Sequence, residues 1–137
     1  MLSNTAEYAL RAVLYVAQHA TDAPVRVGEI SSALELPQNY LSKILHELTK
    51  NGVLVSTRGK HGGFRLGRSA DRLSLHAIVN HFDRIDGRRT CLVGRTACSD
   101  RHACAVHTRW RSVSDAVVRF FRDTTVAELL SGTGAPA

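Results

Sequence analysis

The chain places its three cysteines and one of its histidines in a single short polar stretch, CLVGRTACSDRHACAVH, at Cys91, Cys98, Cys104 and His107. Thiolates and neutral imidazole bind iron–sulfur clusters and zinc, so these four side chains are candidate metal ligands. Their spacing, Cys-x6-Cys-x5-Cys-x2-His, lacks the tight CxxC pairs that structural zinc sites commonly use. We therefore favour a broader cluster, with structural zinc and a cluster-free pair of oxidisable thiols as alternatives. His102, in the same stretch, is expected to be a surface residue.

Size and charge limit the class of protein. A chain of 137 residues suits one domain with a hydrophobic core, and its formal net charge of +6 favours a polyanionic partner. No apolar run approaches the roughly 20 residues of a membrane span. The first residues lack a basic start, and Glu7 and Arg11 interrupt their apolar pattern. We expect a cytoplasmic protein without a membrane partner, where clustered cysteines favour metal or redox chemistry over structural disulfides.

A basic hairpin is predicted near the middle of the chain. No acidic residue occurs between Leu48 and Ala70, whereas five lysines and arginines do. Two β-like runs, 52–57 and 64–66, flank the glycine-rich tip RGKHGG. The hairpin is either a solvated surface feature or a wing that contacts DNA phosphates, with its glycines permitting close approach. The candidate wing contacts are Arg58, Lys60, His61, Gly62, Gly63 and Arg65.

Three amphipathic helices are predicted before the hairpin. Apolar spacing indicates a helix over residues 3–20 that buries Ala6, Leu10, Val13, Leu14 and Ala17. A second helix, 27–34, should bury Ile30, Ala33 and Leu34. After the turn ELP, a third helix over 38–51 should bury Leu41, Ile44, Leu45 and Leu48 and end before a left-handed Gly52.

These elements predict a mainly α protein with a small β-hairpin wing, that is, a winged helix-turn-helix domain. In such a domain the first turn of the second helix of the pair faces base edges. The candidate contacts there are Gln38, Asn39, Tyr40, Ser42 and Lys43. Tyr40 has an alternative role as a partly buried packing residue.

A long helix should follow the cysteines and pair two copies of the chain. Its apolar residues are spaced four, three, four and three apart, at Val106, Trp110, Val113, Val117 and Phe120. The resulting two-fold axis predicts an inverted-repeat DNA target. Thr125 and Glu128 form a capping box for a last short helix. We divide the chain into the DNA-binding domain (1–82), the cluster loop (83–107), the dimerisation and final helices (102–130) and a flexible tail (131–137).

The sequence resembles the IscR/NsrR group of bacterial transcription regulators, the Rrf-two family, over residues 2–130. The motifs that carry the resemblance are EYALRAVLYVA, LPQNYLSKILHELTKNGVL, RGKHGGFRL and LSLHAIV, together with the downstream cysteines. The resemblance implies a homodimer that binds promoter DNA as a repressor or dual regulator. An iron–sulfur cluster near the base of the long helix would tune this binding in response to iron status, oxidants or nitric oxide.

The resemblance also implies a ligand set. By similarity to IscR, Cys91, Cys98 and Cys104 would be ligands with His107 as the fourth, which suits a [2Fe–2S] cluster. The IscR pattern has one residue fewer between its first two cysteines, so a [4Fe–4S] cluster stays open. In the NsrR branch a carboxylate from the partner's first helix reaches a four-iron cluster, and Glu7 occupies that region here. The helix dipole alone also favours an acid in a first helical turn.

Nothing in the sequence indicates an enzyme. The chain has no GxGxxG, Walker or HExxH motif, and its seven histidines are scattered. We expect no catalytic activity.

Overall fold

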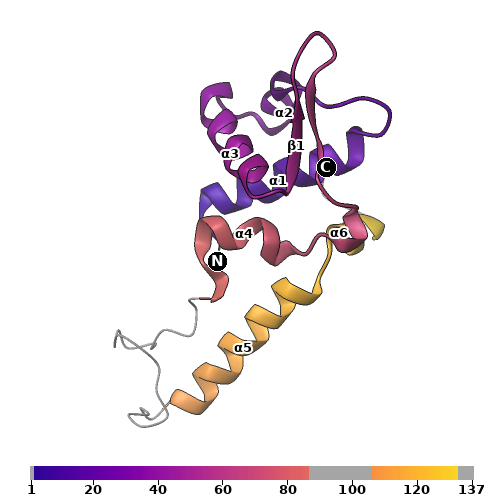
Figure 1. The fold of residues 1–137 in the computed structure, drawn as a ribbon. Helices are drawn as coiled ribbons and strands as arrows, with labels where there is room; N and C mark the ends of the chain where they lie inside the picture. The colour runs from indigo at the N-terminus through magenta and orange to yellow at the C-terminus, as the bar shows by residue number, and fades with distance from the viewer. Residues whose placement is uncertain (1, 87–105, 133–137) are drawn as a thin grey trace.

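A computed structural model describes residues 2–86 and 106–132 (Figure 1). The cysteines therefore lie outside the described residues, whereas His107 lies within them. The elements follow in the order α1 (Asn4–His19), α2 (Val27–Leu34), α3 (Gln38–Lys50), β1 (Leu54–Thr57), β2 (Gly63–Leu66), the short 3-10 helix η1 (Ala70–Arg72), α4 (Leu75–Asp83), α5 (His107–Asp123) and α6 (Val126–Ser131).

Helix α1 is the centre of the core. Its N-cap Ser3 accepts a hydrogen bond from the Ala6 N–H at 3.2 Å. Ala6, Ala9 and Ala12 are fully buried, and their small side chains allow neighbouring helices to approach closely. Helices α2, α3, α4 and α6 and strand β2 all pack against α1. The predicted helix is confirmed, but Leu10 and Ala17 are only half-buried because the most buried face also includes Ala9, Ala12 and Val16.

Helices α2 and α3 confirm the predicted helix-turn-helix. Glu35, in a left-handed conformation with φ 55°, ends α2, and α3 begins directly after Pro37. The four predicted apolar residues of α3 are all buried. The prediction was wrong for Ala33, which is exposed because Ile30 and Leu34, one turn apart, form the inner face of α2. Gly52 has φ 79°, as predicted for the residue that stops α3.

The wing is a two-stranded antiparallel hairpin with an added backbone segment. Its register runs from Leu54 opposite Leu66 to Thr57 opposite Gly63. On the other edge of β2, Val25 and Phe64 exchange two backbone hydrogen bonds, at 3.0 and 2.7 Å. The segment before α2 therefore behaves as a short third strand, which fixes the wing against the helical body.

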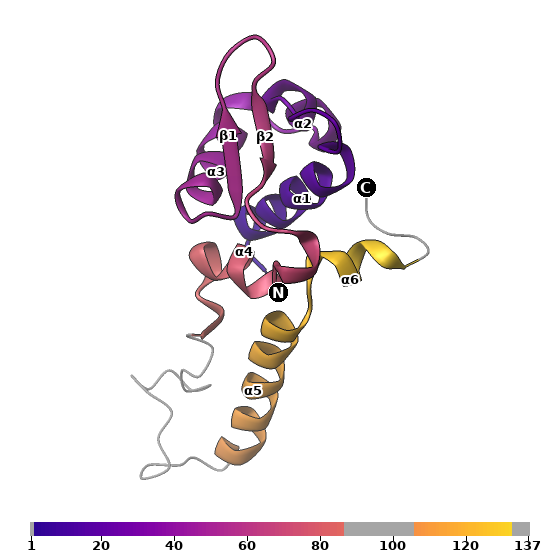
Figure 2. The same cartoon turned by 45° about the vertical axis from the view of Figure 1, so that its right-hand side comes forward.

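The two C-terminal helices differ in how they contact the domain. Helix α5 projects away from the body in both views, and α6 lies back beside η1 (Figures 1 and 2). An antiparallel β-bridge between Ser74 and Thr125 holds the start of α6 against the start of α4. The Leu75 N–H also donates to the Thr124 carbonyl at 2.9 Å. The hydroxyl of Thr125 accepts from the Glu128 N–H at 3.2 Å, which confirms the predicted N-terminal cap of α6.

Helix α5 has two different faces. Ser114, Val118 and Phe121 are buried on one of them. Val113 and Phe120 belong to the predicted pairing stripe and are each 55% exposed, whereas Val106, Trp110 and Val117 are half-buried. The stripe is therefore partly open in a single chain. None of the described helices is long and apolar enough to cross a membrane.

Asp86 joins α4 to α5. Both of its carboxylate oxygens lie 3.1 Å from His76 Nε2, and one accepts from Arg122 at 2.8 Å. The Asp86 N–H also donates to the Asn80 side chain. Desolvation by burial acts to raise the pKa of Asp86, but the hydrogen bonds and charges of His76 and Arg122 outweigh it and lower the pKa below its usual value.

We expect Asp86→Asn to lower the thermal midpoint at neutral pH by roughly 2–4 °C, because partly exposed ion pairs contribute less than about 1 kcal/mol. A carboxylate with a depressed folded pKa stabilises the fold above its unfolded pKa of about 3.9 and loses this contribution as the pH falls through the folded value. The difference from wild type should therefore shrink in acid. Calorimetry across pH checks this, with the exposed Asp123→Asn as control. An equal lowering of the thermal midpoint at every pH would contradict the conclusion that the ionised carboxylate of Asp86 stabilises the fold.

Candidate nucleic-acid interface

The N-terminal half of α3 presents polar side chains to solvent. Leu41, Ile44 and Leu45 are buried against the domain, so the residues between and before them face outward. All five predicted base contacts are exposed, and no acidic residue lies in the first turn of α3. The structure therefore brings together an uninterrupted set of hydrogen-bonding groups at Gln38, Asn39, Tyr40, Ser42 and Lys43.

Tyr40 combines the two roles that the sequence left open. It is 37% exposed, yet its hydroxyl lies 2.9 Å from the Thr5 hydroxyl. Its ring also meets Tyr8 edge-on, with the centroids 6.0 Å apart. Both partners lie on α1, so Tyr40 ties the first turn of α3 to the central helix.

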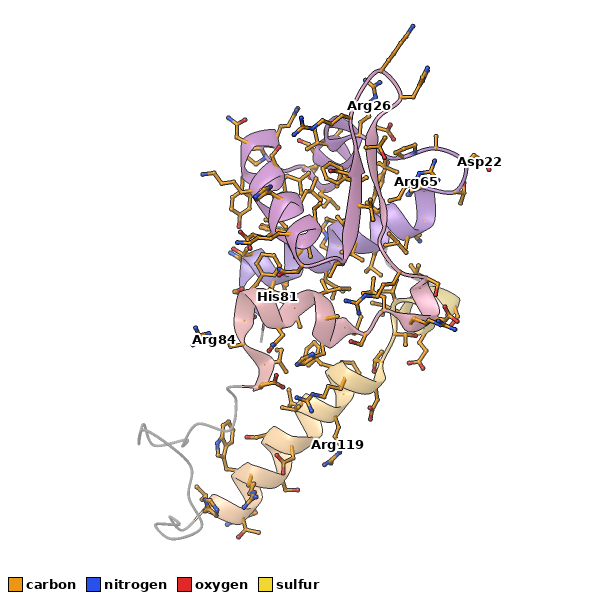
Figure 3. The ribbon with its side chains drawn as sticks, viewed as in Figure 1. Asp22, Arg26, Arg65, His81, Arg84 and Arg119 are labelled. Atoms are coloured by element: carbon orange, nitrogen blue, oxygen red, sulfur yellow. The ribbon has the colours of Figure 1, made fainter. Side chains whose placement is uncertain are left out.

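The basic tip of the wing is held from outside the hairpin. Arg58, Lys60 and His61 are exposed at the tip. Arg26 lies beside the wing (Figure 3), and its guanidinium donates a hydrogen bond to the Lys60 carbonyl. Arg65 is also exposed, and it donates to the Asp22 carbonyl at 3.4 Å. Segment 22–26 therefore contacts the wing at its base and at its tip.

The two wing glycines satisfy an internal requirement. A Cβ on Gly63, which has φ 152°, would lie 2.6 Å from the Val25 carbonyl oxygen. A Cβ on Gly62 would lie 2.2 Å from the Thr57 carbonyl oxygen. The close approach that the sequence assigned to DNA phosphates is thus already needed by the protein's own backbone.

Sequence reasoning missed two polar residues between α3 and the wing. His46 lies one helical turn after Ser42, on the same exposed side of α3. Arg26 lies at the N-cap of α2, beside the wing tip. Helical spacing from Ser42 could have identified His46. The position of Arg26 depends on the third-strand pairing, which no local pattern showed.

Two of the predicted metal ligands can be located. His107 is 6% exposed in the first turn of α5, and Glu7 is exposed in the first turn of α1. Within residues 2–86 and 106–132, no group of three or more histidine, cysteine or acidic side chains is arranged to hold a metal. Cys91, Cys98 and Cys104 lie outside these ranges, so the ligand set stays a prediction.

An exposed polar helix beside a basic hairpin, on a scaffold of packed helices, defines a winged helix-turn-helix protein. Residues 2–132 match the family described as "Iron-dependent Transcriptional regulator", Rrf2. The chain belongs to the Rrf2 family of transcriptional regulators, and it is not an enzyme.

A curated relative supports this assignment, and solved structures share the fold. The chain is 33% identical to the HTH-type transcriptional regulator IscR of Yersinia pseudotuberculosis, covering 95% of this chain and 79% of the relative. It is similar in fold to CymR, the global cysteine regulator of B. subtilis, with a TM-score of 0.81, 23% identity and coverage of 97% and 98% of the two chains. T. potens IscR gives a TM-score of 0.76 at 22% identity, covering 95% and 85%.

We expect Gly63→Ala to destabilise the wing by about 1–3 kcal/mol, because the substitution strains the backbone and forces Val25 away from Phe64. Gly28→Ala is the matched control, since a Cβ there meets nothing within 4 Å. Amide hydrogen exchange at Val25 and Phe64 reports the loss locally. Unchanged protection in Gly63→Ala would contradict the steric account.

Proposed function

We propose that this regulator is a homodimer that binds an inverted repeat in promoter DNA as a repressor, and that an iron–sulfur cluster controls the binding. The observation that carries the cluster assignment is His107, which is buried in the first turn of α5, three positions after Cys104. The predicted fourth ligand thus starts the helix that directly follows the cysteine-bearing segment.

The donor set fits a cluster. Three thiolates and one imidazole satisfy the four positions of a [2Fe–2S] centre, which is the cofactor we favour. The exposed Glu7 is an alternative fourth ligand from the partner subunit, and its oxygen would suit a [4Fe–4S] centre. Bound to these residues, the cluster supplies a redox-active centre that responds to iron supply, oxidants or nitric oxide.

DNA binding rests on α3 and the wing. The polar first turn of α3 supplies the base-edge contacts, and the basic wing supplies phosphate contacts through Arg58, Lys60, His61, Arg65 and the backbone at Gly62 and Gly63. The first turn of α3 and the basic side chains of the wing are exposed, and the net charge of +6 favours the approach of a polyanion.

Dimerisation rests on the open face of α5. Val113 and Phe120 are large apolar residues left exposed on a helix whose other face is buried. Pairing two copies along the stripe from Val106 to Phe120 covers them and places two α3 helices about a two-fold axis. Such a dimer matches DNA half-sites about one helical turn apart, or a multiple of that spacing.

Control by the cluster is transmitted through the ends of α5. His107 lies at its start, while Arg122 in its last turn binds Asp86 beside α4. The angle of α5 therefore depends on what holds each end, and this angle sets the separation of the two α3 helices. A coupling of about 1–3 kcal/mol is sufficient to change DNA affinity about 5- to 150-fold.

The cluster is tested by anaerobic purification with iron, sulfide and zinc analysis and an absorption spectrum. We expect a coloured protein, and we expect Cys98→Ala to lose the visible absorbance and to change affinity for an operator selected from a random duplex pool by at least fivefold. His107→Ala should alter the spectrum, whereas His102→Ala, the matched control, should not.

Each alternative gives a different result. A colourless protein with one zinc per chain supports the structural zinc site. A metal-free protein that loses two hydrogens on peroxide treatment supports the thiol sensor. A coloured protein whose DNA binding is the same in Cys98→Ala would retain the cluster but refute its control of binding.

Phe120→Asp should convert the dimer to a monomer, because a charge replaces an apolar contact worth about 1.5–3 kcal/mol on each of two subunits. Light scattering after gel filtration measures the mass. Arg119→Asp, on the neighbouring exposed position, is the control and should remain dimeric. A dimeric Phe120→Asp protein would place the interface elsewhere.

A further inference from the structure

A hollow of about 370 Å³ lies between the C-terminal half of α1 and the segment that leaves the wing. Val16, Ala17 and Ala20 of α1 line one side of it, and residues 65–69 line the other. We call it the α1–β2 hollow. It lies away from α3, because β2 packs against α1 whereas β1 packs against α3. Its volume falls in the range of about 300–1,000 Å³ that is typical of sites for small ligands.

The walls of the α1–β2 hollow are fixed by the fold. Val16 is fully buried, and β2 is hydrogen-bonded on one edge to β1 and on the other to Val25. The Gly67 N–H donates to the Val53 carbonyl at 2.8 Å, and a Cβ on Gly67 would lie 2.2 Å from the Gly52 carbonyl oxygen. A small ligand therefore meets a preformed site, which is the usual condition for binding one.

The lining combines an apolar floor with a cationic rim. Two arginines, Arg65 and Arg68, are exposed at the rim. No carboxylate is among the described residues that line the hollow, although Asp22 and Asp71 are close in the sequence. Such a lining suits a ligand with an anionic group and a small apolar body. The apolar side chains of the floor are Val16, Ala17, Ala20 and Leu66.

Both arginines have donors to offer a ligand. Arg68 forms no side-chain hydrogen bond or ion pair within residues 2–86 and 106–132. Arg65 donates to the Asp22 carbonyl over 3.4 Å, which uses part of a guanidinium with five N–H groups, and both residues lie on the side of the wing away from α3 (Figure 3). A guanidinium pairs with a carboxylate through two parallel hydrogen bonds, so a carboxylate is the anionic group that this rim recognises best.

The end of α1 favours a single negative charge on the ligand. Ala20 is the C-cap of α1, so the hollow lies at the C-terminal end of that helix. The last carbonyls of a helix carry a partial negative charge, which repels a phosphate dianion more than a carboxylate. Inorganic phosphate would also leave the apolar floor uncovered. The ligand class is therefore a small monocarboxylate with an apolar body.

We propose that the α1–β2 hollow binds a small monocarboxylate, with its carboxylate on Arg68 and Arg65 and its apolar body against the floor. This site is independent of the proposed cluster. Arg68 has no part in the proposed DNA contacts, so the test of the site depends on Arg68.

The test titrates isotope-labelled, full-length, anaerobically purified protein with isocaproate and follows the backbone amides by NMR. We expect saturable binding with a Kd of about 1 mM, which is ordinary for so small a ligand, and shifts centred on Ala20 and Arg68. Isohexyl alcohol has the same apolar body without the charge, and inorganic phosphate has charge without the apolar body. Each should bind at least about fivefold more weakly than isocaproate.

Two variants probe the rim and the floor separately. Arg68→Gln removes the charge of the rim and should weaken isocaproate binding about 3- to 10-fold. Ala17→Leu should abolish binding, because the larger side chain fills the hollow from a half-buried position. Arg119→Gln, on the exposed side of α5, is the matched control for Arg68→Gln and should bind like wild type (Figure 3). The amide spectra verify that the variants are folded.

Three results would overturn the proposal. They are wild-type affinity for isocaproate in Arg68→Gln, phosphate binding as tight as isocaproate binding, and shifts that do not saturate or that lie away from the hollow. If Ala17→Leu does not fold, Arg68→Gln decides alone. None of these results bears on the proposed DNA binding, because no DNA is present in the titration.

Discussion

The burial of α1 is the interaction on which the other elements depend. Its fully buried alanines provide a surface of small side chains, against which four further helices and a wing strand pack. Replacing a buried alanine with a larger residue costs about 1–3 kcal/mol or more, since the neighbouring helices cannot move independently. Tyr40 adds a polar and aromatic connection from α1 to the helix proposed to read DNA. The position of α3 is thus set by the core rather than by α3 alone.

A second constraint concerns the wing, which is not an independent hairpin. Val25 pairs with Phe64, Arg65 reaches Asp22 and Arg26 reaches Lys60, so the segment before α2 determines where the basic tip lies. Arg26 and Phe64, which take part in these contacts, also line a hollow beside the wing. The orientation of the wing and the lining of this hollow therefore depend partly on the same segment before α2.

Local patterns predicted the helices and the hairpin well because apolar spacing and turn residues act over a few positions. The third helix, its left-handed Gly52 and the cap at Thr125 follow from such signals. Long-range pairings left no comparable signal. The backbone contact behind Gly63 and the position of Arg26 depend on residues brought together only by folding. The inner face of α1 was misplaced because several alanines, which are weakly hydrophobic, make up much of it. The cysteine ligands stay a prediction that the described residues do not test.

The third strand also has a consequence for the order of folding. The contacts that hold the wing join residues 34 to 43 positions apart, whereas the helices close over a single turn. Loop closure on that scale costs entropy before any contact compensates for it. Each helix can therefore form before the wing is held in place, and an isolated peptide containing only residues 52–67 lacks the partner that shapes it. A nascent chain fixes the position of its wing only after the segment before α2 has met β2, more than 30 residues further along the chain.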